Sequence, residues 1–176
     1  GNLVGADRRG LRVVNGFGVE MNFGIRGLFN ETPEFDERRF RAEPNFFYVA
    51  GDFRRTTPIT STVGLYTRLS AQLTDQPLVA QEQLALGGFN SVRGYFLAEQ
   101  LVDYGAIASA EMRYSPRLFA DTKLLRRLTL HVFSDYGNGR INAPLPEQQA
   151  DVELASVGAG FRALGAAGRA RVALDW

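Results

Sequence analysis

Three polar residues near the carboxy-terminal end have the types needed for nucleophilic catalysis. His131 is the only histidine of the chain, and Ser134 and Asp135 follow shortly after it. The segment around them, residues 124–137, alternates apolar and polar residues and therefore predicts a β-strand. Side chains of a strand point to alternate faces, so His131 and Asp135 share a face that Ser134 does not. A catalytic triad would need a partner from elsewhere, and we expect that the protein is not an enzyme.

Other common chemistries lack their usual residues. The sequence contains no cysteine and a single histidine, so a metal site would lack ligands. It contains no Gly-x-x-x-x-Gly-Lys-Ser/Thr loop, so no nucleotide site is expected. The formal net charge of +1 gives no reason to expect a nucleic-acid partner. We therefore expect no metal and no cofactor.

The stretch from Gln81 to Tyr104, QEQLALGGFNSVRGYFLAEQLVDY, is a long connection between two predicted strands. Its glycines allow the backbone to turn back on itself. We expect a small core within this loop, formed by Leu84, Leu86, Phe89, Val92, Tyr95 and Phe96. Arg93 lies in the middle of that apolar set and needs a partner wherever the loop packs. Long ordered loops are more often functional than incidental.

The elements that must position these residues are strands. Seven segments alternate apolar and polar residues: 11–27, 46–57, 63–73, 105–115, 124–137, 153–163 and 169–176. The first matches or exceeds the ~9–11 residues of a tilted membrane strand. No helical period is evident, and no apolar run approaches the ~20 residues of a membrane helix.

The two faces of these strands differ in kind. One face is apolar, whereas the other combines glycine and small polar residues with arginine, aspartate and glutamate. Among the 20 basic residues only Lys123 is a lysine, and arginine suits fixed ion pairs better. The predicted connections alternate long and short, as in outer-membrane barrels. The sequence thus predicts an all-β fold, a transmembrane antiparallel β-barrel.

Seven strands cannot close such a barrel, because single-chain bacterial barrels use an even number. We therefore expect residues 1–176 to be the carboxy-terminal part of one incomplete barrel domain. Further strands should precede the first residue, and at least one should follow the last.

Three motifs resemble those of the TpsB transporters of two-partner secretion, also called haemolysin secretion/activation proteins. This family lies within the superfamily of POTRA-containing outer-membrane proteins that includes BamA. The motifs are EQLALGGFNSVRGY at 82–95, FSDYG at 133–137, and SVGAGFR at 156–162 followed by a short turn and RVALDW. Their order and spacing agree with the family across essentially the whole chain.

The resemblance implies a sixteen-stranded barrel in the bacterial outer membrane, of which this chain supplies roughly strands nine to fifteen. The long loop would fold into the lumen. The resemblance implies a conserved-loop anchor made of Val92, Arg93, Gly94 and Tyr95. It also implies a partner motif on the lumen wall made of Phe133, Asp135 and Gly137.

In that arrangement Arg93 lies against Asp135. The residues support the pairing independently, because Asp135 lies on the polar face of its strand and a bidentate contact would anchor the loop. Glu111 and Arg162 are further candidates for the same lumen network.

The function that the resemblance implies is export of a large exoprotein of the TpsA type, a haemolysin or adhesin, from the periplasm to the cell surface. The barrel would be a monomer surrounded by outer-membrane lipid, and POTRA domains outside this chain would recognise the partner. An alternative is a BamA-like factor that assembles outer-membrane proteins. A passive porin is disfavoured, because it has no use for this loop motif. Whether the loop gates or braces the pore stays open.

Overall fold

The computed structural model of the chain describes residues 1–6, 12–24, 45–116, 125–165 and 171–176. These residues form two antiparallel sheets, and none of them lies in a helix. Accordingly, the described part of the chain contains no helix whose length and apolarity would allow it to cross a membrane.

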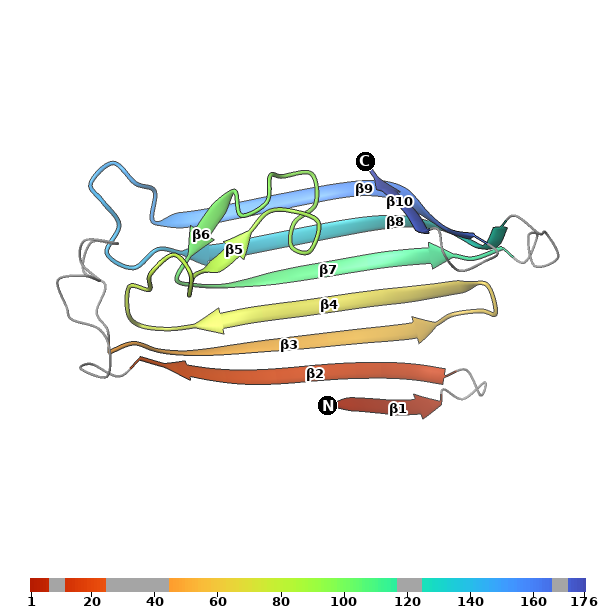
Figure 1. Cartoon of the computed structure of the whole chain (residues 1–176), viewed down its shortest axis with the longest axis horizontal. Coiled ribbons are helices and arrows are strands. Elements are labelled where there is room, and N and C mark those ends of the chain that lie inside the picture. Colours follow the sequence, from red (N-terminus) through yellow and green to blue (C-terminus); the bar gives the residue numbers. More distant parts are fainter. Residues whose placement is uncertain (7–11, 25–44, 117–124, 166–170) are drawn as a thin grey trace.

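The main sheet contains eight strands in the order β1-β2-β3-β4-β7-β8-β9-β10 (Figure 1). Their bounds are β1 Asn2–Ala6, β2 Arg12–Phe23, β3 Phe47–Pro58, β4 Val63–Leu73, β7 Tyr104–Tyr114, β8 Leu125–Arg140, β9 Asp151–Gly165 and β10 Arg171–Asp175. The predicted all-β class is confirmed, and the main sheet contains one strand more than the seven predicted segments. The missed strand is β1, which pairs along β2 and is too short to display a clear alternation.

The last long hairpin is more extended than predicted. The predicted loop at 138–152 shrinks to residues 141–150, because the ladder continues to the pair Arg140↔Asp151. Residues 117–124, between β7 and β8, lie outside the described residues, so the predicted alternation of long and short connections stays a prediction there. Several predictions concern residues outside the described ranges. They are the loop at 29–44 between the first two predicted strands, and the predicted strand residues 11, 25–27, 124 and 169–170.

Each face of the sheet has the character that the alternation predicts. On β8 the residues His131, Phe133 and Asp135 are buried, whereas Leu130 and Val132 are exposed. On β9 Val157 is 82% exposed. The apolar face of the sheet is thus uncovered among the described residues, and the polar face is covered at β7 to β9 (Figure 1).

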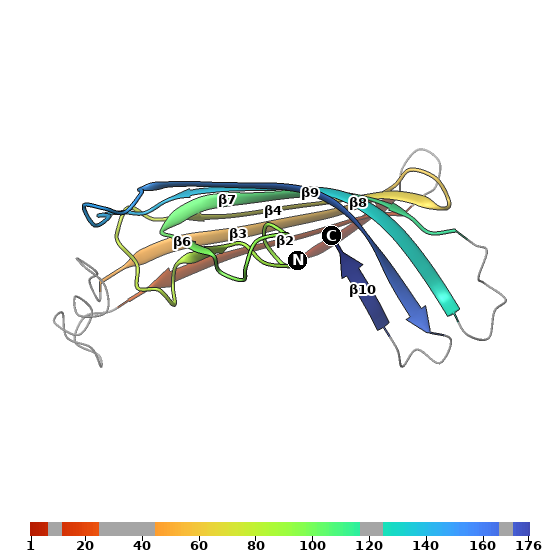
Figure 2. The ribbon, with the colours of Figure 1, turned by 90° about the horizontal axis from the view of Figure 1, so that it is seen from above.

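The cover is the loop between β4 and β7, residues 74–103. The sheet curves, and this loop lies across its concave side in front of β7, β8 and β9 (Figures 1 and 2). We refer to the space on the concave side as the lumen. The loop contains a small hairpin of its own, β5 Leu84–Leu86 paired with β6 Gln100–Val102.

The loop shares its core with the sheet. The shared cluster contains Leu86, Val92 and Val102 of the loop and Ile107, Ile141 and Leu154 of β7, β9 and the chain just after β8, with Leu84, Tyr95 and Val152 packed against them. We refer to strands β7 to β9 and the ends of their connections as the wall. The expectation of a separate core that includes Phe89 and Phe96 is wrong, because these side chains are 60% and 85% exposed. The apolar cluster is formed by the side of the loop that meets the wall, and it fixes the loop against the polar face.

Candidate functional site

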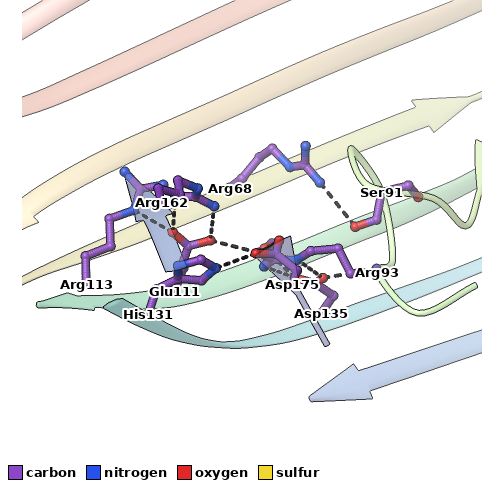
Figure 3. Close-up of polar contacts among 10 residues, drawn as sticks. Arg68, Ser91, Arg93, Glu111, Arg113, His131, Asp135, Arg162 and Asp175 are labelled. Atoms are coloured by element: carbon purple, nitrogen blue, oxygen red, sulfur yellow. Dashed lines mark hydrogen bonds and ion pairs between the residues drawn. The ribbon is translucent and has the colours of Figure 1, made fainter. Parts of the chain in front are cut away.

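The centre of the site is Arg93, whose guanidinium lies on the carboxylate of Asp135 (Figure 3). Nε donates to Oδ2 at 2.7 Å and Nη2 donates to Oδ1 at 2.9 Å, a bidentate contact. The backbone N–H of Arg93 also donates to Oδ2, at 3.2 Å. Ser109 on β7 donates its hydroxyl to Oδ1 of the same carboxylate. Since both partners are buried, the pair is shielded from water and holds the loop to β8.

Glu111 on β7 is the second acidic partner of the site. Its Oε2 accepts from Arg93 Nη1 at 2.8 Å and from Arg162 Nη2 at 3.0 Å. Its Oε1 accepts from Arg113 Nε at 2.6 Å and from Arg162 Nη1 at 2.7 Å. The Glu111 side chain is 3% exposed, so one buried carboxylate joins the loop, β7 and β9.

Asp175 on β10 is a partner that we did not predict. Its Oδ2 lies 3.4 Å from Nη1 of Arg93, and its Oδ1 lies 2.7 Å from Nε2 of His131. The last strand is thereby tied to the same arginine. The alternation of β10 did indicate that Asp175 faces the lumen, because this residue lies on the polar face of a strand whose other face carries Val172 and Leu174.

Phe133 and Tyr95 contribute contacts of a different kind. The guanidinium carbon of Arg93 lies 3.5 Å from the centroid of the Phe133 ring, a cation–π contact. The hydroxyl of Tyr95 donates to the backbone carbonyl of Ala155 at 3.2 Å. The side chain of Arg93 is thus held by an aromatic face as well as by carboxylates, and Tyr95 ties the loop to β9.

Val92, Gly94 and Gly137 fix the backbone and packing of the anchor. Gly94 has φ +88°, a conformation that residues with a Cβ rarely adopt. Val92 is fully buried. A Cβ on Gly137 would lie 2.8 Å from Cγ2 of Val92, so the glycine of the strand motif leaves the space that the loop valine fills.

The base of the loop has a second anchor, Asp103, that we did not predict. Its Oδ1 accepts from the backbone N–H of Leu78 at 2.9 Å, and its Oδ2 accepts from the backbone N–H of Asn142 at 2.6 Å. Gln72 Nε2 donates to its backbone carbonyl at 3.1 Å. Asp103 is fully buried and connects the loop to the chain between β8 and β9. Its position beside a strand start gave no sequence signal.

The electrostatics of the site keep Arg93 charged. Burial alone would lower its pKa, but the hydrogen bonds to Asp135 and Glu111 outweigh burial and raise the pKa above the ordinary value. A buried charge is tolerated only when it is paired in this way. The arrangement is suited to holding two parts of the chain together.

His131, Ser134 and Asp135, the residues considered for catalysis, do not form a triad among themselves. His131 contacts Asp175, while Ser134 is exposed on the other face of β8. The described ranges contain no group of three or more histidine, cysteine, aspartate or glutamate side chains placed to hold a metal ion.

All predicted site residues meet at one place. Val92, Arg93, Gly94, Tyr95, Glu111, Phe133, Asp135, Gly137 and Arg162 lie at or around the contact between the loop and strands β7 to β9. Sequence reasoning missed Ser109, Asp103 and Asp175.

Comparison with known proteins identifies similar chains. The model of the family described as haemolysin secretion/activation protein ShlB/FhaC/HecB matches residues 8–163. Two relatives are heme/hemopexin transporter proteins HuxB. The one from Haemophilus influenzae is 33% identical over 97 residues, which cover 53% of this chain and 16% of the relative. The one from Haemophilus influenzae strain Rd is 26% identical over 152 residues, which cover 82% of this chain and 26% of the relative.

A solved structure has a similar fold. CdiB from Escherichia coli superposes with a TM-score of 0.65 at 21% sequence identity, covering 87% of this chain and 27% of that one. This similarity supports an incomplete β-barrel. The chain spans about a quarter or less of the length of these relatives.

Proposed function

Because the chain belongs to the haemolysin secretion/activation protein family ShlB/FhaC/HecB, we propose that it supplies pore wall and lumen loop to a transporter of two-partner secretion. The protein is an outer-membrane β-barrel protein, and its apolar outer face suits contact with lipid. Residues 1–176 would form the carboxy-terminal part of one barrel domain of sixteen strands that acts as a monomer. The family consists of transport proteins, and we propose that this chain likewise catalyses no reaction.

The proposed substrate is a large exoprotein of the TpsA type, a haemolysin or adhesin, which passes through the barrel in an unfolded state. The observation that carries the proposal is the buried contact between Arg93 on the loop and Asp135 on the wall. A loop held inside the barrel by a paired charge occupies the route of a transported chain. It is therefore placed to control or to support transport, in a way that a surface loop is not.

Deleting the gene and measuring two quantities tests this function. We expect the exoprotein to disappear from the culture medium while the levels of other outer-membrane proteins stay normal, and we expect the complete gene to restore release. Normal release by the deletion strain would contradict the proposal. A general fall in outer-membrane proteins would instead favour the alternative, an assembly factor.

A further inference from the structure

A cleft of about 200 Å³ lies beside the anchor, between the loop and the wall. Four arginines line it, and they come from different elements: Arg68 from β4, Arg93 from the loop, Arg113 from β7 and Arg162 from β9. The acidic residue of the lining is Glu111. Because Arg93 is already paired with Asp135, the cleft offers three further guanidinium groups against one carboxylate.

Arg68 is the least satisfied of these arginines. Its Nη2 donates to the backbone carbonyl of Ser91 at 3.2 Å, while its Nε is buried without a hydrogen-bond partner among the described residues. Directly opposite it on β3 stands another arginine, Arg54, and on β7 stands Ser109. Like charges opposite one another on neighbouring strands are unfavourable. Among the residues that the structure describes, no carboxylate pairs with Arg68.

Arg113 and Arg162 share the carboxylate of Glu111 with each other and with Arg93. Both oxygens of Glu111 already accept from Arg93, Arg113 and Arg162. The guanidinium of Arg113 lies over the ring of Tyr66, 4.2 Å from its centroid. The side chains of Arg113 and Arg162 are 30% and 33% exposed, so both remain accessible from the lumen.

We infer that this cleft binds side-chain carboxylates of acidic segments in the polypeptide that passes through the pore. The inference rests on the proposed function and specifies one chemical property of its substrate. Guanidinium groups suit carboxylates because their donors form a planar fork. Partial exposure weakens each contact through solvent screening. A weak contact also suits transport, because a passing group must be able to leave as well as to bind.

The test measures binding of a labelled ten-residue glutamate peptide to the complete gene product, purified in detergent, by fluorescence anisotropy at low salt. A ten-residue glutamine peptide, free glutamate and inorganic phosphate serve as comparison ligands. We expect the glutamate peptide to bind more tightly than all three. Arg68→Gln should weaken its binding about five- to tenfold, the range for loss of a charge-assisted hydrogen bond that is partly screened.

Two further variants make the result specific. Arg113→Gln should also weaken binding, which keeps the inference testable if Arg68→Gln does not fold. Arg140→Gln should leave binding unchanged, because Arg140 lies at the far end of β8 in an exposed ion pair with Asp151 at 3.5 Å. The altered migration of a folded barrel on unheated gels verifies folding of each variant.

Equal binding of the glutamate and glutamine peptides, or unchanged binding by both folded cleft variants, would overturn the inference. Equally tight binding of free glutamate or phosphate would reduce the cleft to a simple anion site and overturn the polypeptide assignment. Secretion by the unmodified protein distinguishes failure of the cleft inference from failure of the proposed function. If the exoprotein is released but the peptide result is negative, only the cleft inference fails, whereas lack of release contradicts the proposed function itself.

Discussion

Arg93 and Asp135 meet through two parallel hydrogen bonds of 2.7 and 2.9 Å across 42 positions of sequence. The Asp135 side chain is fully buried, and that of Arg93 is 8% exposed. Removing one partner of a buried pair leaves the other charge unpaired and typically costs about 3–5 kcal/mol. Loss of either partner should therefore loosen the loop at this point.

The geometry of the arginine should matter as well as its charge. We predict that Arg93→Lys lowers secretion of the exoprotein substantially, because an ammonium group cannot form the fork that reaches Asp135 and Glu111 together. The matched control is Arg140→Lys at the end of β8, an exposed position that should secrete normally. Secretion by Arg93→Lys at the level of the unmodified protein would mean that charge alone is sufficient.

The packing of Gly137 against Val92 gives a prediction about rescue. We predict that Gly137→Ala loosens the loop and lowers secretion, because the added Cβ would lie 2.8 Å from Cγ2 of Val92. Combining it with Val92→Ala should recover part of the loss, since that change removes the colliding methyl group. Gly5→Ala is the control, because a Cβ at Gly5 meets no atom within 4 Å.

Two measurements check the prediction for Gly137 and Val92: limited proteolysis of the loop in intact barrels, and the amount of exoprotein secreted. Gly137→Ala should be cut faster than the unmodified protein, and the double variant more slowly than Gly137→Ala. A double variant that is cut fastest of all would show that the two positions act independently.

The base of the loop should respond differently from its tip. We predict that Asp103→Ala increases cleavage within residues 74–86, because the backbone N–H groups of Leu78 and Asn142 lose the carboxylate that accepts from both. Loss of a hydrogen bond to a buried group typically costs about 1–3 kcal/mol, and the Leu78 N–H lies in a buried hydrogen bond. Unchanged cleavage in this segment would contradict the role of Asp103 as an anchor.

The fold and the centre of the site could be predicted to different depths. Strict alternation placed β4, β7 and β8 within a few residues, because a sheet with one apolar and one polar face imposes a period of two. The same parity placed Asp135 on the face toward the loop, and an arginine among apolar residues required such a partner.

Other features depend on contacts that alternation does not encode. β1 is too short to display a period, and the extension of β8 to Arg140 depends on its pairing with β9. Asp103 lies in a connection, where parity gives no direction. The exposure of Phe89 and Phe96 also escaped prediction, because composition describes which residues a loop contains but not which side of the loop meets the wall.

The central claim is that the contact between Arg93 and Asp135 holds the loop as secretion requires. The most direct measurement compares release of the exoprotein by Arg93→Ala, Asp135→Ala and the double variant, each with membrane insertion of the barrel verified. We predict that each single variant inserts but secretes poorly, and that the double variant is little worse, because two residues that act as a unit are not additive. Normal secretion by both single variants would contradict the claim.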